Sequence, residues 1–296
     1  MTVLISAVLP IALVALAGVC VGRSFDLDLR TLARLNIYAL LPALVLTSLA
    51  ETTLGLRSAI ALVAAFLLNT ALLYLLARGL GRSLKFSPDE QKSLIATTLF
   101  ANVGNMGLPF VLFSLGEAGL ERAVVYLVGS SLMVASVFPI VLKGTGIRAG
   151  VRFTVQLPVF WAALLGLGLQ IGNEALPEAI NRGVTLLSGG AIPIALLTLG
   201  IQLSQTQFAF GPYELFGSGL RLIVSPLMAY SIGRVLGLEG LDLQVLVLQA
   251  AMPVAVNSLI WVTELGGDTV RVARTIVLST FLSFLTLPGV LWLSAL

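Results

Sequence analysis

Ten long apolar runs follow one another along the 296-residue chain, separated by short polar stretches. A membrane-crossing helix needs about 20 mostly apolar residues to traverse a hydrocarbon core of about 30 Å. The chain is 58% apolar and only 10% charged, whereas soluble domains carry about 25% charged residues. The sequence therefore predicts an all-α integral membrane protein and excludes an ordinary soluble enzyme. The expected spans are 3–22, 31–50, 58–80, 93–115, 122–142, 157–173, 184–203, 215–237, 243–263 and 273–295.

The side chains most used in catalysis and metal binding are scarce. The chain has no histidine and a single cysteine, Cys20, so it lacks imidazole ligands, histidine proton relays and the two thiols of a disulfide. All 14 acidic residues fall in predicted loops or at the ends of spans. We therefore expect no catalytic residue, no metal site and no cofactor, and an intramembrane enzyme is the alternative that this inventory disfavours.

The basic residues are distributed unevenly among the loops. Thirteen of the 17 lysines and arginines follow odd-numbered spans and four follow even-numbered spans; the thirteen include Arg221, taken as a charge at the start of the eighth span. Positive loops face the cytoplasm. The pattern predicts a multi-pass protein of the cytoplasmic (inner) membrane with both termini outside. The net charge of +3 is thus a topology signal, and no nucleic-acid partner is expected.

Prolines recur at a nearly constant offset of 144 to 151 residues. The repeat divides the chain into halves, 1–150 and 151–296, with five spans each. An odd number of spans makes the second half enter the membrane from the opposite side, which is the inverted repeat of many secondary transporters. The proline pairs are Pro10 and Pro158, Pro42 and Pro193, Pro109 and Pro253, and Pro139 and Pro288.

Two matching spans contain helix-breaking residues near their centres. Residues 102–109 of the fourth span hold two asparagines, two glycines and a proline, and Pro253 interrupts the ninth span after Met252. Proline lacks an amide donor but suits the first turn of a new helix. We therefore expect half-helices to begin near Pro109 and Pro253, with hinges at Gly104, Pro109, Met252 and Pro253.

Half-helices that begin at the membrane centre would aim their positive dipole ends at one another, and this favours an anion such as a carboxylate. The alternative reading is that a lone proline only kinks a helix and a lone asparagine only bonds a neighbouring helix; it applies to Asn36, Asn69 and Gln249. The candidate substrate-binding residues are Asn102, Asn105, Gly107, Pro109, Pro253, Asn257 and Ser258.

The same residues resemble a known family. Asn102 followed by Met106-Gly107-Leu108-Pro109 is similar to the Asn-x-x-x-Met-Gly-x-Pro signature of the auxin efflux carrier family, which includes bacterial members and the plant PIN carriers. Residues 249–253, Gln-Ala-Ala-Met-Pro, resemble the family's second crossover sequence, and Leu-Pro-Ala-Leu at 41–44 fits its second helix.

The resemblance implies two inverted five-helix repeats in which broken spans 4 and 9 cross. Spans 1, 2, 6 and 7 would form a scaffold that makes a homodimer in the lipid bilayer, and spans 3–5 and 8–10 would form a transport domain that moves as an elevator. The cargo would be a small organic anion, auxin-like or a carboxylate. Asn102 matches the position that holds the substrate carboxylate, whereas Asn257 stands where plant members often carry proline.

Three transport modes remain open at this point. Because no carboxylate is expected at the midplane, the sequence favours uniport of an anion driven by the membrane potential. A sodium-coupled symporter of the bile-acid-carrier type is the main alternative, because sodium can be held by backbone carbonyls. A channel is the third.

Overall fold

The computed structural model describes residues 2–143, 147–205, 209 and 211–294, so residue 295, the expected end of the last span, lies outside them. In these residues the chain is helical, apart from loops and one isolated antiparallel bridge between Ala101 and Val254. The contacts divide it into two compact units. The first unit contains residues 1–59 and 104–205, and the second contains residues 60–103 and 206–296.

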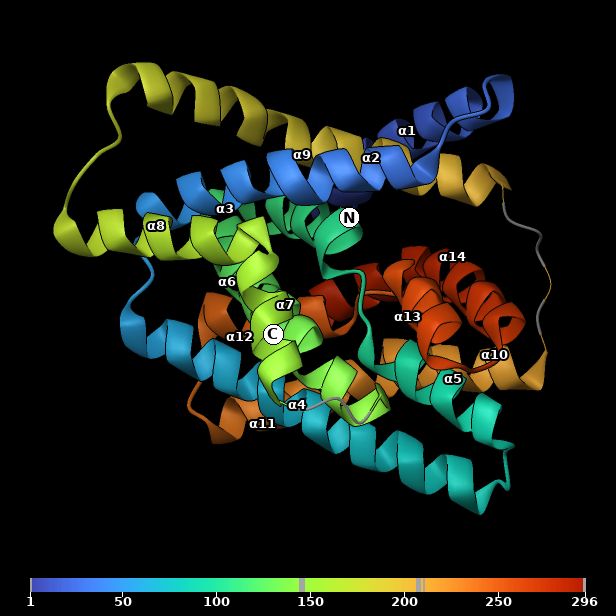
Figure 1. The fold of residues 1–296 in the computed structure, drawn as a ribbon. Coiled ribbons are helices and arrows are strands. Elements are labelled where there is room, and N and C mark those ends of the chain that lie inside the picture. Colours follow the sequence, from blue (N-terminus) through green and yellow to red (C-terminus); the bar gives the residue numbers. More distant parts are fainter. Residues whose placement is uncertain (1, 144–146, 206–208, 210, 295–296) are drawn as a thin grey trace. The chain divides into compact units, whose positions relative to one another are not determined.

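The first unit is built mainly from the helices before residue 59 and those after residue 104 (Figure 1). α1 packs along α9, and α3 packs against α8 and α9. Its elements are α1 (Thr2–Ser24), α2 (Leu29–Leu35), the π-helical turn η1 (Asn36–Leu40), α3 (Leu41–Ala50), the π-helical turn η2 (Val103–Gly107, which begins one residue before this unit), α6 (Leu108–Lys143), α7 (Ile147–Gln156), α8 (Pro158–Gly172) and α9 (Glu178–Gln205).

The second unit packs α14 against α5, α10, α12 and α13. Its last helix therefore contacts elements from both ends of the unit's sequence. Its elements are α4 (Leu56–Ser83, whose first turn belongs to the first unit), α5 (Pro88–Leu99), α10 (Pro212–Gly219), the π-helical turn η3 (Leu220–Val224), α11 (Ser225–Val235), α12 (Gly240–Ala250), α13 (Asn257–Leu265) and α14 (Thr269–Ser294).

Several described helices are long and apolar enough to cross a membrane. Five satisfy this by length and composition, and a sixth does so if the two helices that meet at a 68° bend before Pro158 count as one span. The prediction of an all-helical, multi-pass membrane protein is therefore confirmed, while the ten-span inverted repeat stays a prediction. The five are Leu29–Ala50, Leu56–Ser83, Glu178–Gln205, Pro212–Val235 and Thr269–Ser294.

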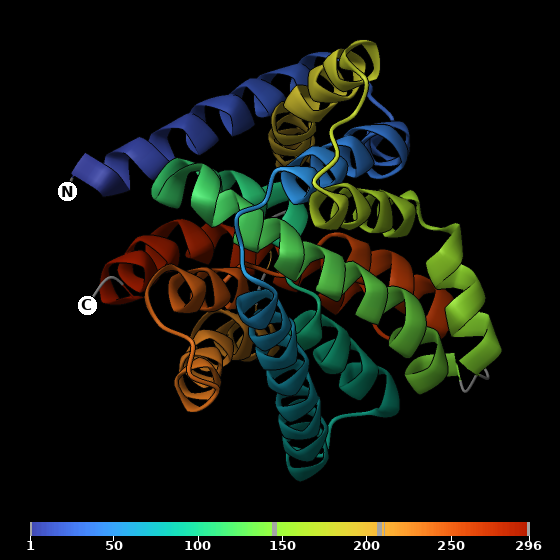
Figure 2. The same ribbon diagram turned by 90° about the vertical axis from the view of Figure 1, so that its left-hand side faces the viewer.

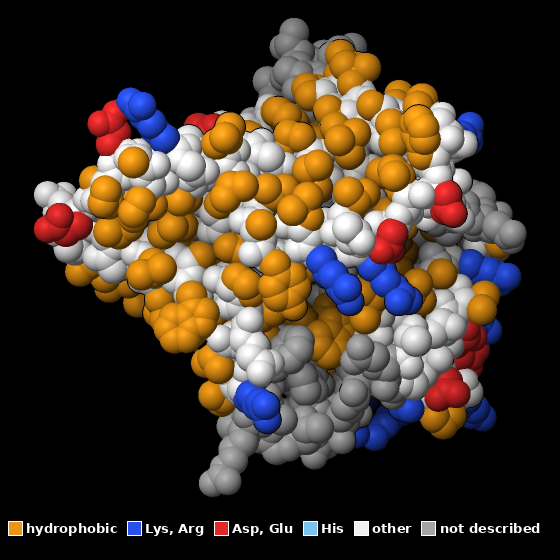
Figure 3. Space-filling view, turned by 45° about the horizontal axis from the view of Figure 1, so that its top comes forward, with side chains coloured by type: hydrophobic (Ala, Val, Ile, Leu, Met, Phe, Trp, Pro, Cys, Tyr) orange, Lys and Arg blue, Asp and Glu red, His pale blue; other side chains and the backbone are white. Residues whose placement is uncertain are grey.

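Large apolar side chains cover much of the surface of these helices. Leu186 on α9 is 81% exposed and Ile171 on α8 is 80% exposed, and Figure 3 shows apolar side chains spread over one face of the molecule. Contiguous exposed apolar surface of this kind marks contact with a membrane or a partner.

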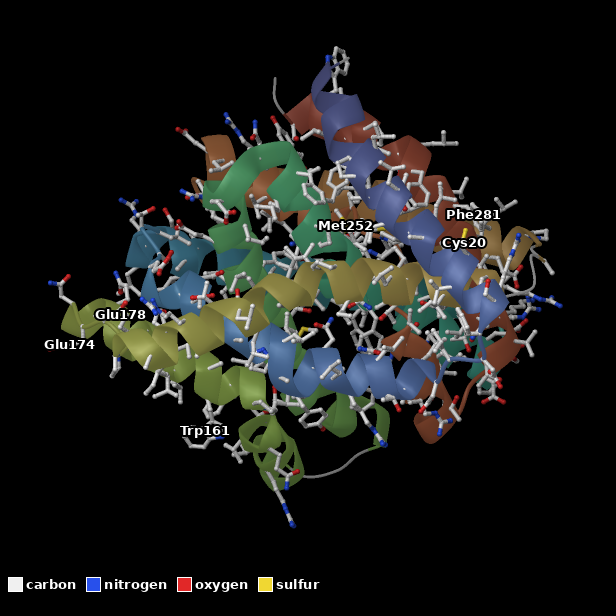
Figure 4. All side chains as sticks on the ribbon, turned by 90° about the horizontal axis from the view of Figure 1, so that it is seen from above. Cys20, Trp161, Glu174, Glu178, Met252 and Phe281 are labelled. Carbon is white, nitrogen blue, oxygen red and sulfur yellow. The ribbon has the colours of Figure 1, made fainter. Side chains whose placement is uncertain are left out.

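The charged Glu174 and Glu178 lie at the turn between α8 and α9, whereas Trp161 lies on α8 (Figure 4).

Each of the three π-helical turns is followed, at the second residue after its end, by a proline: Pro42, Pro109 or Pro226. A proline ring collides with the carbonyl group one turn earlier in an α-helix, and a wider turn makes room for it. Pro10, Pro193 and Pro288 instead lie inside helices that continue past them, as the kink interpretation expects.

Glycines bring α1 and α9 into close contact, and the two helices lie side by side in both ribbon views (Figures 1 and 2). A Cβ atom on Gly200 would lie 1.9 Å from the carbonyl oxygen of Ala15, and one on Gly18 would lie 2.3 Å from that of Leu197. Small residues allow such backbone approach between helices in a membrane.

The substitution Gly200→Ala should destabilise the first unit, because the added methyl group meets main-chain atoms that cannot rotate away. Overpacking of this kind costs about 1–3 kcal/mol, so we expect a lower midpoint of thermal unfolding (Tm) in detergent. The control is Gly189→Ala on the same helix, where a Cβ atom has no neighbour within 4 Å. Equal Tm values for the two variants would contradict this account of the α1–α9 contact.

Candidate functional site

One end of the second unit is fixed by an arginine that joins three helix N-termini. The Arg271 guanidinium on α14 lies 2.7 Å from the Glu90 carboxylate of α5, 3.4 Å from that of Asp268 and 3.8 Å from that of Glu214 on α10. The Tyr213 hydroxyl also donates to the carbonyl oxygen of Glu90 at 2.7 Å. These contacts hold the starts of α5, α10 and α14 together.

α5 itself begins with a reciprocal cap. The Ser87 hydroxyl accepts a hydrogen bond from the Glu90 amide at 3.3 Å, and the Glu90 carboxylate accepts one from the Ser87 amide at 2.9 Å. This capping box satisfies two main-chain donors at the helix start. It fixes where α5 begins, and twelve residues later the helix ends at Leu99.

Two non-helical segments lie against each other in the second unit. The first, residues 100–102, follows α5, and the second, residues 251–256, separates α12 from α13. The Asn102 amide donates to the Pro253 carbonyl at 2.8 Å, and the Ala255 amide donates to the Phe100 carbonyl at 2.8 Å. The interrupted backbones thus satisfy each other, as backbone at membrane depth must be satisfied within the protein.

Side chains from neighbouring helices support this antiparallel pair. The Val254 amide donates to the Ser279 hydroxyl of α14 at 3.1 Å, and the Ser279 side chain is fully buried. The Phe100 ring stacks on that of Trp261 of α13, with 6.3 Å between centroids and 4° between planes. The two segments are therefore anchored to α13 and α14.

Asn102 lies in the first segment and is 5% exposed. Its main-chain amide is used in the pairing, but its side-chain nitrogen Nδ2 is buried without a hydrogen-bond partner among the described residues. Buried polar atoms are paired in most proteins, so each unpaired one needs an explanation. A donor in this state has the chemistry to receive an oxygen of a ligand.

The second segment carries further candidate residues. Met252, labelled in Figure 4, and Pro253 are buried in it. Ser258 is fully buried, and its hydroxyl donates to the Ala255 carbonyl at 2.6 Å, whereas Asn257 is exposed. The half-helix expected near Pro253 is α13, which begins four residues later at Asn257, after residues 254 and 255 have paired with the first segment.

The remaining candidates belong to the first unit. Gly104, Asn105 and Gly107 lie in η2, and Pro109 is the second residue of α6. The helix expected to begin near Pro109 begins with η2 at Val103 and continues as α6 from Leu108. Asn102, Met252, Pro253 and Ser258 thus belong to the second unit. The four candidates just named, Gly104, Asn105, Gly107 and Pro109, belong to the first unit.

Arg221 was misread from the sequence as a loop charge. It lies in η3, inside the candidate span Pro212–Val235, and is 2% exposed. Its guanidinium donates to the main-chain carbonyls of Thr98, Ala250 and Met252. A single arginine near the start of an apolar run looks the same in sequence whether it faces water or the interior, so its burial had no sequence signal.

Other buried polar atoms collect in the second unit. The Asn69 side chain donates to the Ser225 hydroxyl at 3.5 Å, an interhelical contact of the kind that the alternative reading expected. Within the described parts of the chain, no group of three or more acidic or cysteine side chains could hold a metal ion. The side-chain atoms without a partner include Asn69 Oδ1, Thr98 Oγ1, Ser218 Oγ and both amide atoms of Gln249.

Comparison with known proteins now decides the family. A family model described as "Membrane transport protein" matches residues 3–149 and 151–291. The chain belongs to this family. It is the auxin efflux carrier family that the motifs around Asn102 and Pro253 resemble, so a transporter, and not an enzyme, is the activity that the family indicates.

Similar proteins carry transporter names. An uncharacterized transporter of Methanothermobacter thermautotrophicus is 34% identical over 278 residues, which cover 90% of this chain and 88% of the relative. An uncharacterized transporter of Methanocaldococcus jannaschii is 29% identical over 74% of this chain and 73% of its own length. A Rhizobium meliloti protein provisionally named a malonate transporter is 25% identical over 66% of this chain and 64% of its own length.

The substitution Ser279→Ala should destabilise the paired segments, because it leaves the Val254 amide buried without an acceptor. Such a loss costs about 1–3 kcal/mol, and we expect a lower Tm together with faster hydrogen exchange at the Val254 amide. Thr280→Val is the matched control, since the Thr280 hydroxyl donates to the Ile276 carbonyl of its own helix. Unchanged exchange at Val254 in Ser279→Ala would contradict this role.

The stability of the second unit should depend on pH through Glu90. Its hydrogen bond from the Ser87 amide, together with the nearby Arg271 guanidinium, holds the pKa of Glu90 below its ordinary value. A lowered pKa stabilises the folded state above the ordinary carboxyl pKa, and this contribution is lost as the pH falls through the lowered value.

We therefore expect the difference in Tm between the wild type and Glu90→Gln to be largest near neutral pH and to shrink as the medium becomes acidic. Thermal unfolding measured from pH 7 to pH 3 tests this. Asp89→Asn, a change at the neighbouring exposed carboxylate, is the control. If the Tm difference between the wild type and Glu90→Gln instead grew on acidification, a lowered pKa of Glu90 could not be its cause.

Proposed function

We propose that this protein is a secondary transporter that moves a small organic anion across the cytoplasmic membrane. The observation that carries the proposal is the buried, unpartnered Nδ2 group of Asn102 beside two paired non-helical segments. A neutral amide donor binds a carboxylate without a permanent charge, so the anion can also leave. Membership of a family of membrane transport proteins supports the same conclusion.

The proposed cargo carries a carboxylate, as auxin-like acids and small carboxylic acids do. The Rhizobium meliloti relative is provisionally named for malonate, a dicarboxylate. The candidate groups in the second unit are Asn102, the backbone of Pro253, and Asn257 and Ser258 at the start of α13. Asn105, Gly107 and Pro109 of the fourth span are proposed as further substrate-binding residues, because the sequence interrupts that helix around them.

The proposed architecture has ten spans in two inverted repeats, with the broken fourth and ninth spans crossing and both termini outside. The backbone bonds between residues 100–102 and 253–255 support the crossing. The joined N-termini of α5, α10 and α14 support the topology, because the charge pattern assigns the loops before all three to the cytoplasmic side. A homodimer through the scaffold spans is part of the same proposal.

Elevator-type alternating access is the proposed mechanism, and it requires a division of the chain into bodies with separate packing. Spans 1, 2, 6 and 7, the expected scaffold, all fall in the first unit, and spans 3, 8, 9 and 10 fall in the second. The helix of span 5 packs with the first unit. We propose that the membrane potential drives anion movement, at about 2.3 kcal/mol per charge per 100 mV.

Variants of Asn102 test the proposed site directly. Loss of a hydrogen bond to a charged group costs about 1.5–3 kcal/mol, so Asn102→Ala should lower kcat/KM for radiolabelled malonate uptake into proteoliposomes by about tenfold to a hundredfold. Asn102→Asp should abolish uptake, because a carboxylate repels the anion, and Asn102→Gln should retain part of it.

The control for these variants is Thr280→Val, which lies outside the candidate site. Uptake should be saturable, should increase with an imposed membrane potential and should persist when choline replaces sodium. Strict dependence on sodium would favour the symporter alternative, and unsaturable flux would favour a channel. Wild-type uptake rates in Asn102→Asp would remove Asn102 from the site.

A further inference from the structure

Arg221 occupies a position that is expensive for a charged residue. It lies inside the apolar span Pro212–Val235, with nine residues of the span before it and fourteen after it, and it is 2% exposed. Ionisable groups within a membrane are rare, and they mark functional positions in most proteins that contain them. Arg221 is not among the residues proposed to bind the anion.

The partners of Arg221 are main-chain carbonyls from both interrupted helices. Nη1 donates to the Thr98 carbonyl of α5 at 2.9 Å, Nε donates to the Met252 carbonyl at 3.0 Å, and Nη2 donates to the Ala250 carbonyl of α12. Thr98 and Ala250 lie in the last two residues of their helices. One guanidinium therefore joins the C-terminal ends of two helices that are far apart in sequence.

These carbonyls form an electronegative site. The last four carbonyls of a helix receive no hydrogen bond from an amide of the same helix, and the helix dipole adds about half a negative charge at that end. Two such ends face the same guanidinium here. In transporters with broken helices, unwound carbonyls and half-helix C-terminal ends are groups that coordinate a coupling sodium ion.

Further contacts fix the position. The Ser225 hydroxyl donates to the Ala250 carbonyl at 2.9 Å, and the Asn69 side chain of α4 donates to Ser225. Arg221 itself lies in the wide turn η3, which ends two residues before Pro226. The Ala250 carbonyl thus accepts two hydrogen bonds, one from the Arg221 guanidinium and one from the Ser225 hydroxyl. A carbonyl that binds a metal ion can likewise accept a hydrogen bond from a neighbouring side chain.

We propose that Arg221 is a tethered cation that takes the place of a free coupling cation between the C-terminal ends of α5 and α12. It neutralises the two negative helix ends and holds the paired segments at the geometry that positions Asn102. Because the positive charge is covalently attached, this position needs no sodium ion. Shortening the side chain to alanine leaves a carbonyl-lined site for a small monovalent cation.

This inference concerns the same region as the proposed function, and its consequence for sodium dependence rests on that function. Its structural part does not, because the occupancy of the carbonyl site by a cation can be measured without any transport. The experiment therefore uses thermal unfolding of the full-length protein in detergent as its first readout.

The first measurement compares the Tm of the wild type, Arg221→Ala and Arg234→Ala. Arg234 lies on α11 in the same candidate span, but it is exposed, so it is the matched control. Each protein is titrated with guanidinium, sodium or choline chloride at millimolar concentrations and constant ionic strength. We expect Arg221→Ala alone to have a much lower Tm and to regain part of it saturably with guanidinium or sodium, but not with choline.

The second measurement separates charge from packing and applies even if Arg221→Ala does not fold. Lysine keeps the positive charge but presents a single nitrogen to the carbonyls, and glutamine keeps amide donors without the charge. We expect the Tm to fall in the order wild type, Arg221→Lys, Arg221→Gln. A Tm for Arg221→Gln equal to or above that of Arg221→Lys would overturn the proposal, as would a cation response in Arg221→Ala no different from that of Arg234→Ala.

The transport readout then tests the consequence for coupling. In proteoliposomes, wild-type malonate uptake should be the same in sodium and in choline, whereas uptake by Arg221→Ala should be reduced and should rise several-fold with sodium or guanidinium. Sodium-dependent uptake by the wild type would overturn the tethered-cation proposal. Absence of malonate uptake by the wild type, with cation rescue of the Tm intact, would count against the proposed cargo alone.

Discussion

The constraint on which the second unit depends is that backbone polar groups within a membrane must find partners inside the protein. Two helices, α5 and α12, end at Leu99 and Ala250 and are too short to cross a membrane. Their interrupted backbones bond to each other through Asn102 and Pro253 and through Phe100 and Ala255. Each segment supplies hydrogen-bond partners for the other, so either interruption alone would leave buried backbone groups unpaired. The pairing also brings main-chain donors and carbonyls from the two segments to one place.

Side chains around this junction form hydrogen bonds with its backbone. Ser279 accepts a hydrogen bond from a main-chain amide, and Arg221 donates to main-chain carbonyls. The Asn102 side-chain nitrogen, by contrast, lacks a partner among the described residues. Under the proposed function, this amide supplies the binding chemistry.

Sequence reasoning located both interruptions because asparagine, glycine and proline disfavour helix within a short window. It identified the start of α6 near Pro109, but it placed the next half-helix near Pro253, four residues before α13 begins at Asn257. Proline marks where an α-helix loses a hydrogen bond, and it does not say how far the chain stays extended. That length depends on the partner segment. Arg221 was missed for a related reason, since the carbonyls that accept its hydrogen bonds come from residues 98, 250 and 252.

The sequence by itself determined that the chain is a helical membrane protein, where two of its helices break and which family it belongs to. These properties follow from local composition, from proline and glycine chemistry and from short motifs, all of which are present in a linear string. The tertiary structure decided which backbones pair, that Arg221 is buried between two helix ends, and that the Asn102 Nδ2 donor lacks a partner in the described part of the chain. Such features depend on hydrogen bonds between residues about 30 to 155 positions apart, and no local pattern specifies the partner of a long-range bond.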